Sequence, residues 1–265
     1  MDCDFLRNLL EKLIAAEREA GELILGARDI PAETKSSHRD VVTEYDKKVQ
    51  ALMISRLRAA VPSAAFFCEE NAVQEELGGE HVFIIDPIDG TMNFVRHFHR
   101  SCISAAYMSR GEILLAAVYD PYADEMFTAI KGQGAFLNGR PISAGSAPLR
   151  ESVFCFGSSP YYPQFTKRSF QLAELAFEHS LDLRRMASAE LDLCSVAAGR
   201  AGMYFELCIS FWDYAAGSLI VTEAGGSCCR INGSPLPMDG SSSSIIAGSR
   251  EAAADFLRLI AENNI

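Results

Sequence analysis

The chain has 265 residues, nearly half of them hydrophobic, which is enough for one large domain or two closely packed lobes. Its 24 basic and 35 acidic residues give a net charge of −11, which argues against binding nucleic acid through a broad basic surface. The charge does not exclude a small anionic substrate, because a bound metal ion can reverse the local sign of charge.

The sequence shows no sign of membrane insertion or of a disulfide framework. No apolar run approaches the roughly 18 residues of a membrane-spanning helix, and the N-terminus lacks a signal-peptide core. The eight cysteines are scattered without a CxxC pair, so mostly reduced thiols are expected. The sequence therefore predicts a cytoplasmic protein with no membrane partner and no direct nucleic-acid partner.

The N-terminal part of the chain is predicted to be helical. Apolar residues recur with helical spacing from Phe5, and this first helix is expected to end within residues 21–26. A second helix is expected over about residues 45–60, and Thr43 with Asp46 resembles its capping box.

The middle of the chain is richer in strands. Short apolar segments bounded by Gly, Pro or Asp predict strands there, and Asn138-Gly139 predicts the turn of a hairpin. From residue 150 onwards strands and helices are mixed, and a final helix is expected after Ser249. The predicted strands are "HVFIIDP", "SCISAAYMS", "EILLAAVYDP", "EMFTAI", "VFCFGS", "LDLRRM", "AGMYFEL" and "SSIIAGS", and the later helices are "TKRSFQLAELAFEHS", "AELDLCSVAAGR" and "FWDYAAGSLIVTEAGG".

This mixture of strands and helices favours an α/β or α+β layered fold. A seam near residues 140–150 divides the chain into two expected lobes that pack as one unit. The first lobe, residues 1–145, is α+β and carries most of the candidate metal ligands. The second, residues 146–265, is α/β and carries Glu206 and Asp213.

The segment "FIIDPIDGTMNF" runs from a buried strand into two acids, a glycine and a hydroxyl. Pro87 biases Asp86 towards an extended conformation, and Gly90 permits a sharp turn. The amides of Gly90 and Thr91 could then face an anion as a helix begins. The chain has no GxxxxGK[ST] loop, GxSxG elbow or HExxH helix, and the spacing after Asp86 does not fit an EF-hand.

Four acids share the same kind of position, at a strand end or a helix start. They are Asp86 and Asp89 in this turn, Glu69 in "CEEN" and Asp213 in "FWDYAAG". Turn capping is the alternative for the first two alone. Four neighbouring carboxylates without a cation would repel one another, and carboxylates with a backbone carbonyl suit Mg²⁺ or Mn²⁺.

Several of these segments resemble the inositol monophosphatase family, which belongs to a magnesium-dependent, lithium-sensitive phosphomonoesterase superfamily. "DPIDGTMNF" is similar to D-P-I-D-G-T-x-N-F, and "FWDYAAGSLIVTEAGG" to W-D-x-A-A-G followed by E-A-G-G. "CEE" and "KSSHRDVVTEYD" resemble two further elements, in order and spacing from Lys35 to about Gly226. The resemblance implies a layered αβαβα sandwich of the inositol monophosphatase and fructose-1,6-bisphosphatase type, and a homodimer.

The resemblance also implies roles for individual residues. Asp46 would accept a hydrogen bond from Thr91 and so help activate a water molecule, with helix capping as its alternative role. Lys35 is either a supporting cation or a solvated lysine. The implied catalytic residues are Glu69, Thr91 and Asp46. Two or three Mg²⁺ ions, or Mn²⁺ in their place, would be held by Glu69, Asp86, the Ile88 carbonyl, Asp89 and Asp213. The substrate would be bound by Gly90, Thr91, Ser188, Ala189 and Glu206.

The implied function is Mg²⁺-dependent hydrolysis of myo-inositol monophosphate or a similar small phosphorylated polyol. Glu206 matches the family glutamate that hydrogen-bonds ring hydroxyls, with a buried structural glutamate as the alternative. Glu190 replaces a small residue, and it would either favour an aminated substrate or face solvent. Two other functions stay open: a related phosphatase acting on histidinol phosphate, fructose 1,6-bisphosphate or a nucleotide 3′-phosphate, and a protein-binding partner of transcription machinery.

Overall fold

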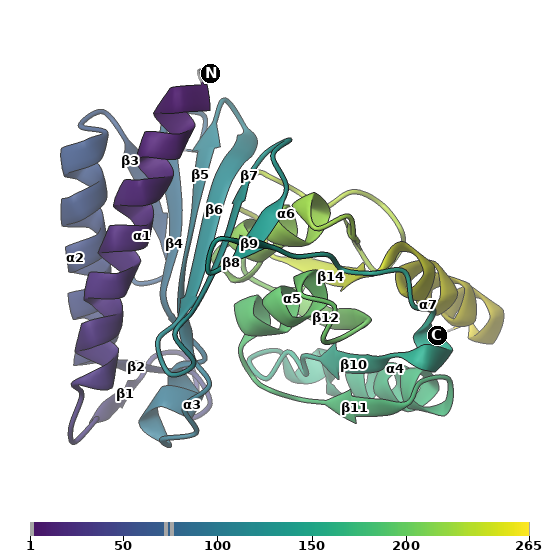
Figure 1. The fold of residues 1–265 in the computed structure, drawn as a ribbon. Coiled ribbons are helices and arrows are strands. Elements are labelled where there is room, and N and C mark those ends of the chain that lie inside the picture. Colours follow the sequence, from purple (N-terminus) through teal and green to yellow (C-terminus); the bar gives the residue numbers. More distant parts are fainter. Residues whose placement is uncertain (1–2, 72–73, 75–76, 265) are drawn as a thin grey trace.

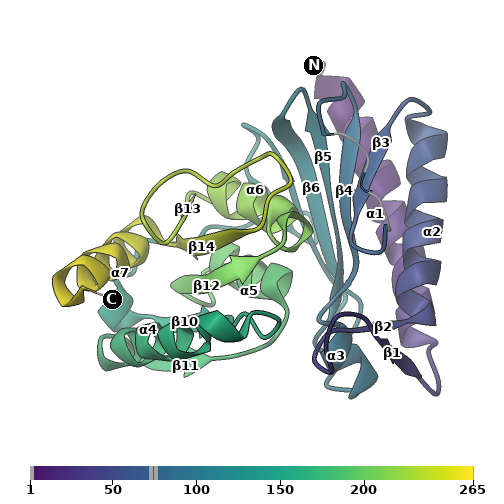
Figure 2. The same ribbon diagram turned by 180° about the vertical axis from the view of Figure 1, so that it is seen from behind.

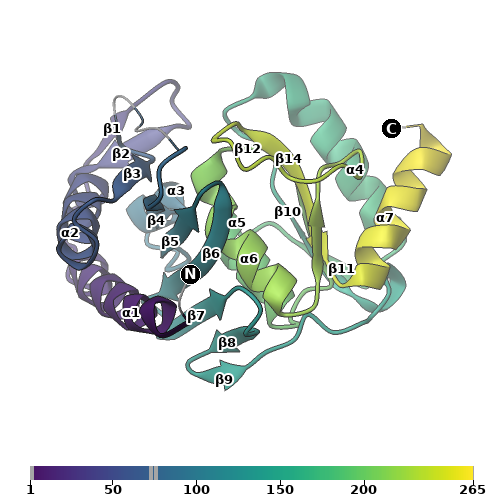
Figure 3. The same ribbon diagram turned by 90° about the horizontal axis from the view of Figure 1, so that it is seen from above.

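The computed structural model describes residues 3–71, 74 and 77–264, and these form five layers (Figures 1 and 2). Two helices cover one face of a seven-stranded sheet, two helices lie between this sheet and a five-stranded sheet, and two more cover the far side (Figure 3). This order confirms the predicted αβαβα sandwich. The three helix layers are α1 (Cys3–Leu25) with α2 (Glu44–Ala60), α5 (Ala189–Ala197) with α6 (Ala215–Glu223), and α4 (Thr166–Glu178) with α7 (Arg250–Asn263).

The larger sheet has the strand order β3-β4-β5-β6-β7-β8-β9. β3 and β4 are parallel, and every later pair is antiparallel. β4 and β5 are buried along their whole lengths, because helices cover both faces of the sheet. The strands are β3 (Ala65–Cys68), β4 (Val82–Asp89), β5 (Cys102–Ser109), β6 (Glu112–Asp120), β7 (Glu125–Ile130), β8 (Ala135–Leu137) and β9 (Arg140–Pro141).

The smaller sheet has the order β11-β10-β12-β14-β13. β10 is parallel to β11 and β12, whereas β14 is antiparallel to β12 and β13. This pairing places the end of β12 near the middle helix layer. The strands are β10 (Val153–Phe156), β11 (Asp182–Arg184), β12 (Met203–Ile209), β13 (Ser227–Cys229) and β14 (Ser243–Gly248).

Most predicted elements are present. The Asn138-Gly139 turn joins β8 to β9, with both residues at positive φ as a tight hairpin requires. The capping box of α2 is confirmed, since Thr43 accepts from Asp46 N–H and the Asp46 side chain accepts from Thr43 N–H. The helix predicted from "FWDYAAG" begins later than expected. Phe211–Asp213 forms a separate 3₁₀ turn, closed by a capping box between Ser210 and Asp213, and α6 starts only at Ala215.

Several short elements lie outside the prediction. β1 and β2 pair as a two-stranded antiparallel sheet that precedes α2, and β13 is a three-residue edge strand. In contrast, the short helix α3 after β4 begins where the sequence predicts, directly after Gly90. The elements not yet located are β1 (Ala32–Thr34), β2 (Val41–Thr43), α3 (Thr91–Val95) and the 3₁₀ turns η1 (Leu149–Glu151), η2 (Pro163–Phe165) and η3 (Phe211–Asp213).

A shared apolar core joins the two halves of the chain. Val118 and Phe127 of the larger sheet belong to the same buried cluster as Leu193 of α5 and Ile220 of α6. This packing holds the segments before α5 and α6 against the end of β4. Within the described residues, no helix is long and apolar enough to cross a membrane. No disulfide joins the cysteines of the described residues, which agrees with the mostly reduced thiols that the sequence predicts.

Candidate active site

The end of β4 presents two carboxylates through an irregular turn. The ladder between β4 and β5 shifts register between Asp86 and Asp89, so both side chains leave the regular sheet pattern. The Ile88 N–H donates to Asp86 Oδ1 at 3.0 Å and holds that carboxylate. Gly90 has φ +83°, and a Cβ there would lie 2.9 Å from the Arg100 carbonyl oxygen, so the position requires glycine.

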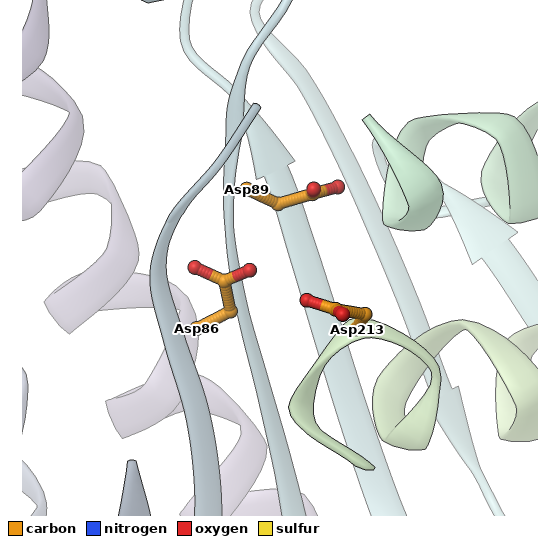
Figure 4. A group of neighbouring side chains, drawn as sticks. All are labelled: Asp86, Asp89 and Asp213. Atoms are coloured by element: carbon orange, nitrogen blue, oxygen red, sulfur yellow. The ribbon is translucent and has the colours of Figure 1, made fainter. Parts of the chain in front are cut away.

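Asp213 approaches this turn from the other half of the chain. Its Oδ2 accepts a hydrogen bond from the Ser210 N–H at 2.9 Å, which fixes the side chain in the η3 turn. One carboxylate oxygen from each of Asp86, Asp89 and Asp213 lies within 4.8 Å of the others (Figure 4). Three acids from two separate segments thus point into one space, and oxygen donors in such a group suit a hard divalent cation.

Glu69 follows β3 and joins this group beside Asp86. Its carboxyl is close enough for its charge to raise the pKa of Asp86. Lys35 Nζ lies 2.9 Å from Glu69 Oε1 and also pairs with Glu70, so Lys35 places a positive charge at the edge of the cluster. Lys35 is therefore ion-paired with two carboxylates rather than a freely solvated surface lysine.

Burial and mutual repulsion perturb the acids of this cluster. Burial raises the pKa of Asp86 well above its usual value, and the charges of Glu69, Asp89 and Asp213 raise it further. The pKa of Asp213 is raised in the same way. Burial also raises the pKa of Glu69 to about 7, against the opposing effect of Lys35. Since the carboxylates oppose one another's ionisation, the group fits bound divalent cations that would compensate the charge.

Thr91 and Asp46 form a hydrogen-bonded pair next to the acids. Thr91 Oγ1 lies 3.1 Å from Asp46 Oδ1 and 3.0 Å from the Ile88 carbonyl oxygen, and it can donate its single hydrogen to either. Asp46 Oδ2 meanwhile accepts from the Thr43 N–H at 2.7 Å. The capping contact and the Thr91 contact, which the sequence left as alternatives, are therefore both present.

The start of α5 holds Asp89 in place. Ser188 Oγ donates to Asp89 Oδ2 at 2.6 Å, and the Glu190 N–H donates to the same oxygen at 2.7 Å. The Ala189 N–H donates to Asp89 Oδ1 at 3.3 Å. Asp89 thus acts as the acceptor for the first N–H groups of a helix more than 90 residues away. Ser188 contacts Asp89 directly, in addition to lining the larger cavity described next.

Two adjoining cavities surround these residues. The smaller one has a volume of about 280 Å³, and the residues predicted to bind metal all line it: Glu69, Asp86, Ile88, Asp89 and Asp213. The larger one, of about 650 Å³, is lined by the residues predicted to bind substrate, namely Gly90, Thr91, Ser188, Ala189 and Glu206. Asp46 lies behind Thr91 and lines neither.

Glu206 is a buried acid at the far side of the larger cavity. The Ser159 N–H donates to its Oε1 at 2.6 Å and the Tyr204 hydroxyl to its Oε2 at 2.7 Å. A Cβ on Gly157 would overlap the Glu206 carboxyl group, so only glycine fits there. Gly157, Ser159 and Tyr204 were not among the predicted site residues. The only signal for Gly157 and Ser159 is the "GSSP" turn that follows the strand "VFCF", and Tyr204 lies within the predicted strand "AGMYFEL" without a signal of its own.

Glu190 does not occupy either position that the sequence offered. Its side chain is fully buried, so it does not face solvent, and it lines neither cavity. Asp192, two positions along the helix, is the acid of α5 that lines the larger cavity, and it too is buried. The suggested contact of Glu190 with an aminated substrate is therefore wrong, because α5 turns this side chain away from the cavity.

Comparison with known proteins agrees with this architecture. Residues 6–264 match the model of the inositol monophosphatase family. The chain belongs to the inositol monophosphatase family. A Vibrio cholerae relative named Nus factor SuhB is 36% identical over 264 residues, covering 96% of both chains.

Solved structures of this family superpose on the fold. The Thermotoga maritima IMPase has a TM-score of 0.84 and 32% identity, covering 94% of this chain and 95% of its own. An IMPase/NADP phosphatase complexed with Mg²⁺ and phosphate has a TM-score of 0.81 and 25% identity, covering 94% of this chain and 91% of its own. The family resemblance read from the sequence is confirmed.

Proposed function

We propose that this protein is a magnesium-dependent phosphatase that hydrolyses myo-inositol monophosphate or a similar polyol phosphate to the alcohol and inorganic phosphate. The observation that carries the proposal is the convergence of Asp86, Asp89 and Asp213, whose oxygens lie within 4.8 Å of one another beside Glu69. Family membership, and the related phosphatase that binds Mg²⁺ and phosphate, support the same reading.

The acids would act as the cation site. Glu69, Asp86, the Ile88 carbonyl, Asp89 and Asp213 line one cavity and would hold two or three Mg²⁺ ions, or Mn²⁺ in their place. When bound, such cations neutralise phosphate oxygens, lower the pKa of the attacking water and stabilise the leaving alkoxide.

The chain's own side chains would orient the water and the phosphate. Thr91 donates its hydroxyl hydrogen to Asp46 or to the Ile88 carbonyl, which leaves its oxygen free to accept a hydrogen bond from water. Because burial raises the pKa of Asp46, this carboxylate is a better proton acceptor than an exposed one. The amides of Gly90 and Thr91, where the short helix α3 begins, would bind phosphate oxygens.

The larger cavity would take the alcohol part of the substrate. Glu206 is held by Ser159 and Tyr204 and keeps unused lone pairs that can accept hydrogen bonds from hydroxyl groups. Asp192 is a second buried acid of the same cavity, with one oxygen that has no partner among the described residues. Two buried acceptors in one cavity favour a substrate with several hydroxyl groups, as in a polyol phosphate.

Phosphate release from a panel of esters tests this proposal. The panel contains inositol 1-phosphate, glycerol 2-phosphate, histidinol phosphate, fructose 1,6-bisphosphate and adenosine 3′-phosphate, each with and without Mg²⁺ and with added Li⁺. We expect Mg²⁺-dependent turnover that is fastest for the polyol phosphates and inhibited by Li⁺.

A pair of variants isolates the site. Asp213→Asn should abolish turnover, whereas Asp124→Asn should not, because Asp124 is an exposed residue paired with Arg18. Turnover that is independent of Mg²⁺, or that survives in Asp213→Asn, would contradict the proposal. Preference for another ester of the panel would retain the cation site and reassign the substrate.

A second candidate function rests on the names of the relatives. The Vibrio cholerae relative and several others are named Nus factor SuhB, which favours a role in contact with transcription machinery. Capture of partners from a native lysate by the wild type and by Asp213→Asn would test it. A partner that binds both proteins equally would show a binding role separate from the acids.

A further inference from the structure

Glu190 lies between the two segments that carry Asp89 and Asp213. It is the second residue of α5, its side chain is fully buried, and it lines neither cavity. Its backbone N–H donates to Asp89 Oδ2 at 2.7 Å. Its side chain points the other way, towards α6, and its Oε2 lies only 2.5 Å from where a Cβ on Gly217 would be.

The start of α6 needs a group of this kind. The helix begins at Ala215, two residues after Asp213, and Tyr214 at its N-cap provides no side-chain hydrogen bond. The first N–H groups of a helix carry partial positive charge and require an acceptor or a negative charge. The Glu190 carboxyl packs against this first turn, and both of its oxygens are buried without another hydrogen-bond partner among the described residues.

Glu190 therefore contacts Asp89 and also the helix that follows Asp213. Its main chain holds Asp89 from the start of α5, while its side chain packs on the turn of α6 that follows Asp213. α5 and α6 lie side by side in the middle layer (Figure 3). A change in the Glu190 side chain would alter the distance between these two helix starts, and with it the separation of the two acids.

We propose that Glu190 is a positioning residue that fixes the spacing of Asp89 and Asp213 and thereby sets the affinity of the site for divalent cations. This inference rests on the cation site of the proposed function. The site depends on carboxylates from two separate helix starts, so its geometry is only as rigid as the contact between them. No direct contact of Glu190 with a cation or substrate is required.

Calorimetric titration of the substrate-free protein with Mn²⁺ and with Mg²⁺ tests the proposal. Glu190→Ala removes the side chain that contacts α6, and we expect it to weaken cation binding about tenfold, as loss of a supporting residue does in other metal sites. Glu190→Gln keeps the shape and one oxygen acceptor, so its affinity should fall by only about threefold. The Mg²⁺ concentration for half-maximal phosphate release should rise by the same factors, whereas kcat at saturating Mg²⁺ should change little.

Glu17 provides a matched control. It is also fully buried, its carboxyl oxygens have no partner among the described residues, and it lies in α1 on the opposite face of the larger sheet. Whatever Glu17→Ala does to the melting temperature, it should leave the cation dissociation constant unchanged.

The possible outcomes separate this inference from the proposed function. A Glu190→Ala protein that binds Mn²⁺ as tightly as the wild type would overturn the positioning role. Should that variant fail to fold, Glu190→Gln decides instead, and an unchanged dissociation constant would overturn the role. A wild type that binds no divalent cation would overturn the proposed site itself.

Discussion

Replacing Asp89 with Asn removes a negative charge from the site while keeping most of the hydrogen bonds that this side chain makes. An asparagine can place its carbonyl oxygen where Asp89 Oδ2 now accepts from Ser188 Oγ and the Glu190 N–H, at 2.6 and 2.7 Å. Only the Ala189 N–H, which now donates to Oδ1 at 3.3 Å, would then face the amide nitrogen of the asparagine and lose its acceptor. Losing one such hydrogen bond lowers the free energy of unfolding by about 1 kcal/mol. Removing a negative charge beside Asp86 and Asp213 offsets part of this cost in the cation-free protein.

The two forms should differ in their response to cations. Without Mg²⁺, Asp89→Asn should melt within about 4 °C of the wild type. With Mg²⁺ at about 100 times its dissociation constant, the wild type should gain about 2.7 kcal/mol, and the variant should gain much less. That difference corresponds to a shift in melting temperature of about 5–10 °C. Phosphate release should fall by a factor of about 10³ or more, equivalent to about 4 kcal/mol of barrier.

Thermal melts and phosphate-release assays on the same preparations measure both effects. Asp124→Asn serves as the control for an aspartate-to-asparagine change, since its ion pair with Arg18 lies at the surface. An Asp89→Asn protein that keeps the full Mg²⁺-induced shift in melting temperature would contradict a role for Asp89 in binding the cation. Near-normal turnover in that variant would refute it equally.

Four further predictions concern substrate contact, water activation, pH and assembly. Glu206→Gln should raise KM for polyol phosphates about tenfold but leave KM for p-nitrophenyl phosphate nearly unchanged, because only the polyol phosphates offer hydroxyls to this acid. Equal increases in KM for both substrates would argue for a purely structural glutamate. Thr91→Val should lower kcat about 10²-fold with little change in cation affinity, which titration of the variant can check. Burial raises the pKa of Glu69 to about 7 and raises the pKa of Asp86 well above its usual value, so these acids stabilise the cation-free fold at low pH. They lose that contribution as pH rises through their folded pKa values. Since protons compete with Mg²⁺, the Mg²⁺-induced rise in melting temperature should be larger at about pH 8 than at about pH 5.5, and a rise independent of pH would contradict the assignment. The homodimer implied by the family predicts a light-scattering mass of twice 28.9 kDa, and a mass of 28.9 kDa would contradict it.

Local sequence patterns predicted the parts of the fold whose causes are local. The capping box of α2 and the Asn138-Gly139 turn depend on neighbouring residues, and both are present. The three-residue strands β1, β2 and β13 were missed because so short a segment shows no periodicity. The Phe211–Asp213 turn was merged with α6, since the apolar pattern continues through both.

Contacts between distant segments could not be read from the pattern. The sequence offers no rule that pairs Ser159 with Glu206, because that contact depends on which strands lie side by side in the smaller sheet. Glu190 was expected in the cavity or in solvent, but its orientation depends on the rotation of α5 against α6. The family signatures identified the acids, whereas the contacts that hold each acid in place depend on tertiary packing.

The most direct test of the cation site is a crystal structure of the protein soaked in Mn²⁺, with data collected at the manganese absorption edge. We expect anomalous peaks within coordination distance of Asp86, Asp89 and Asp213, with Lys35 remaining beside Glu70. Peaks elsewhere, or carboxylates that keep their positions with no manganese between them, would contradict it.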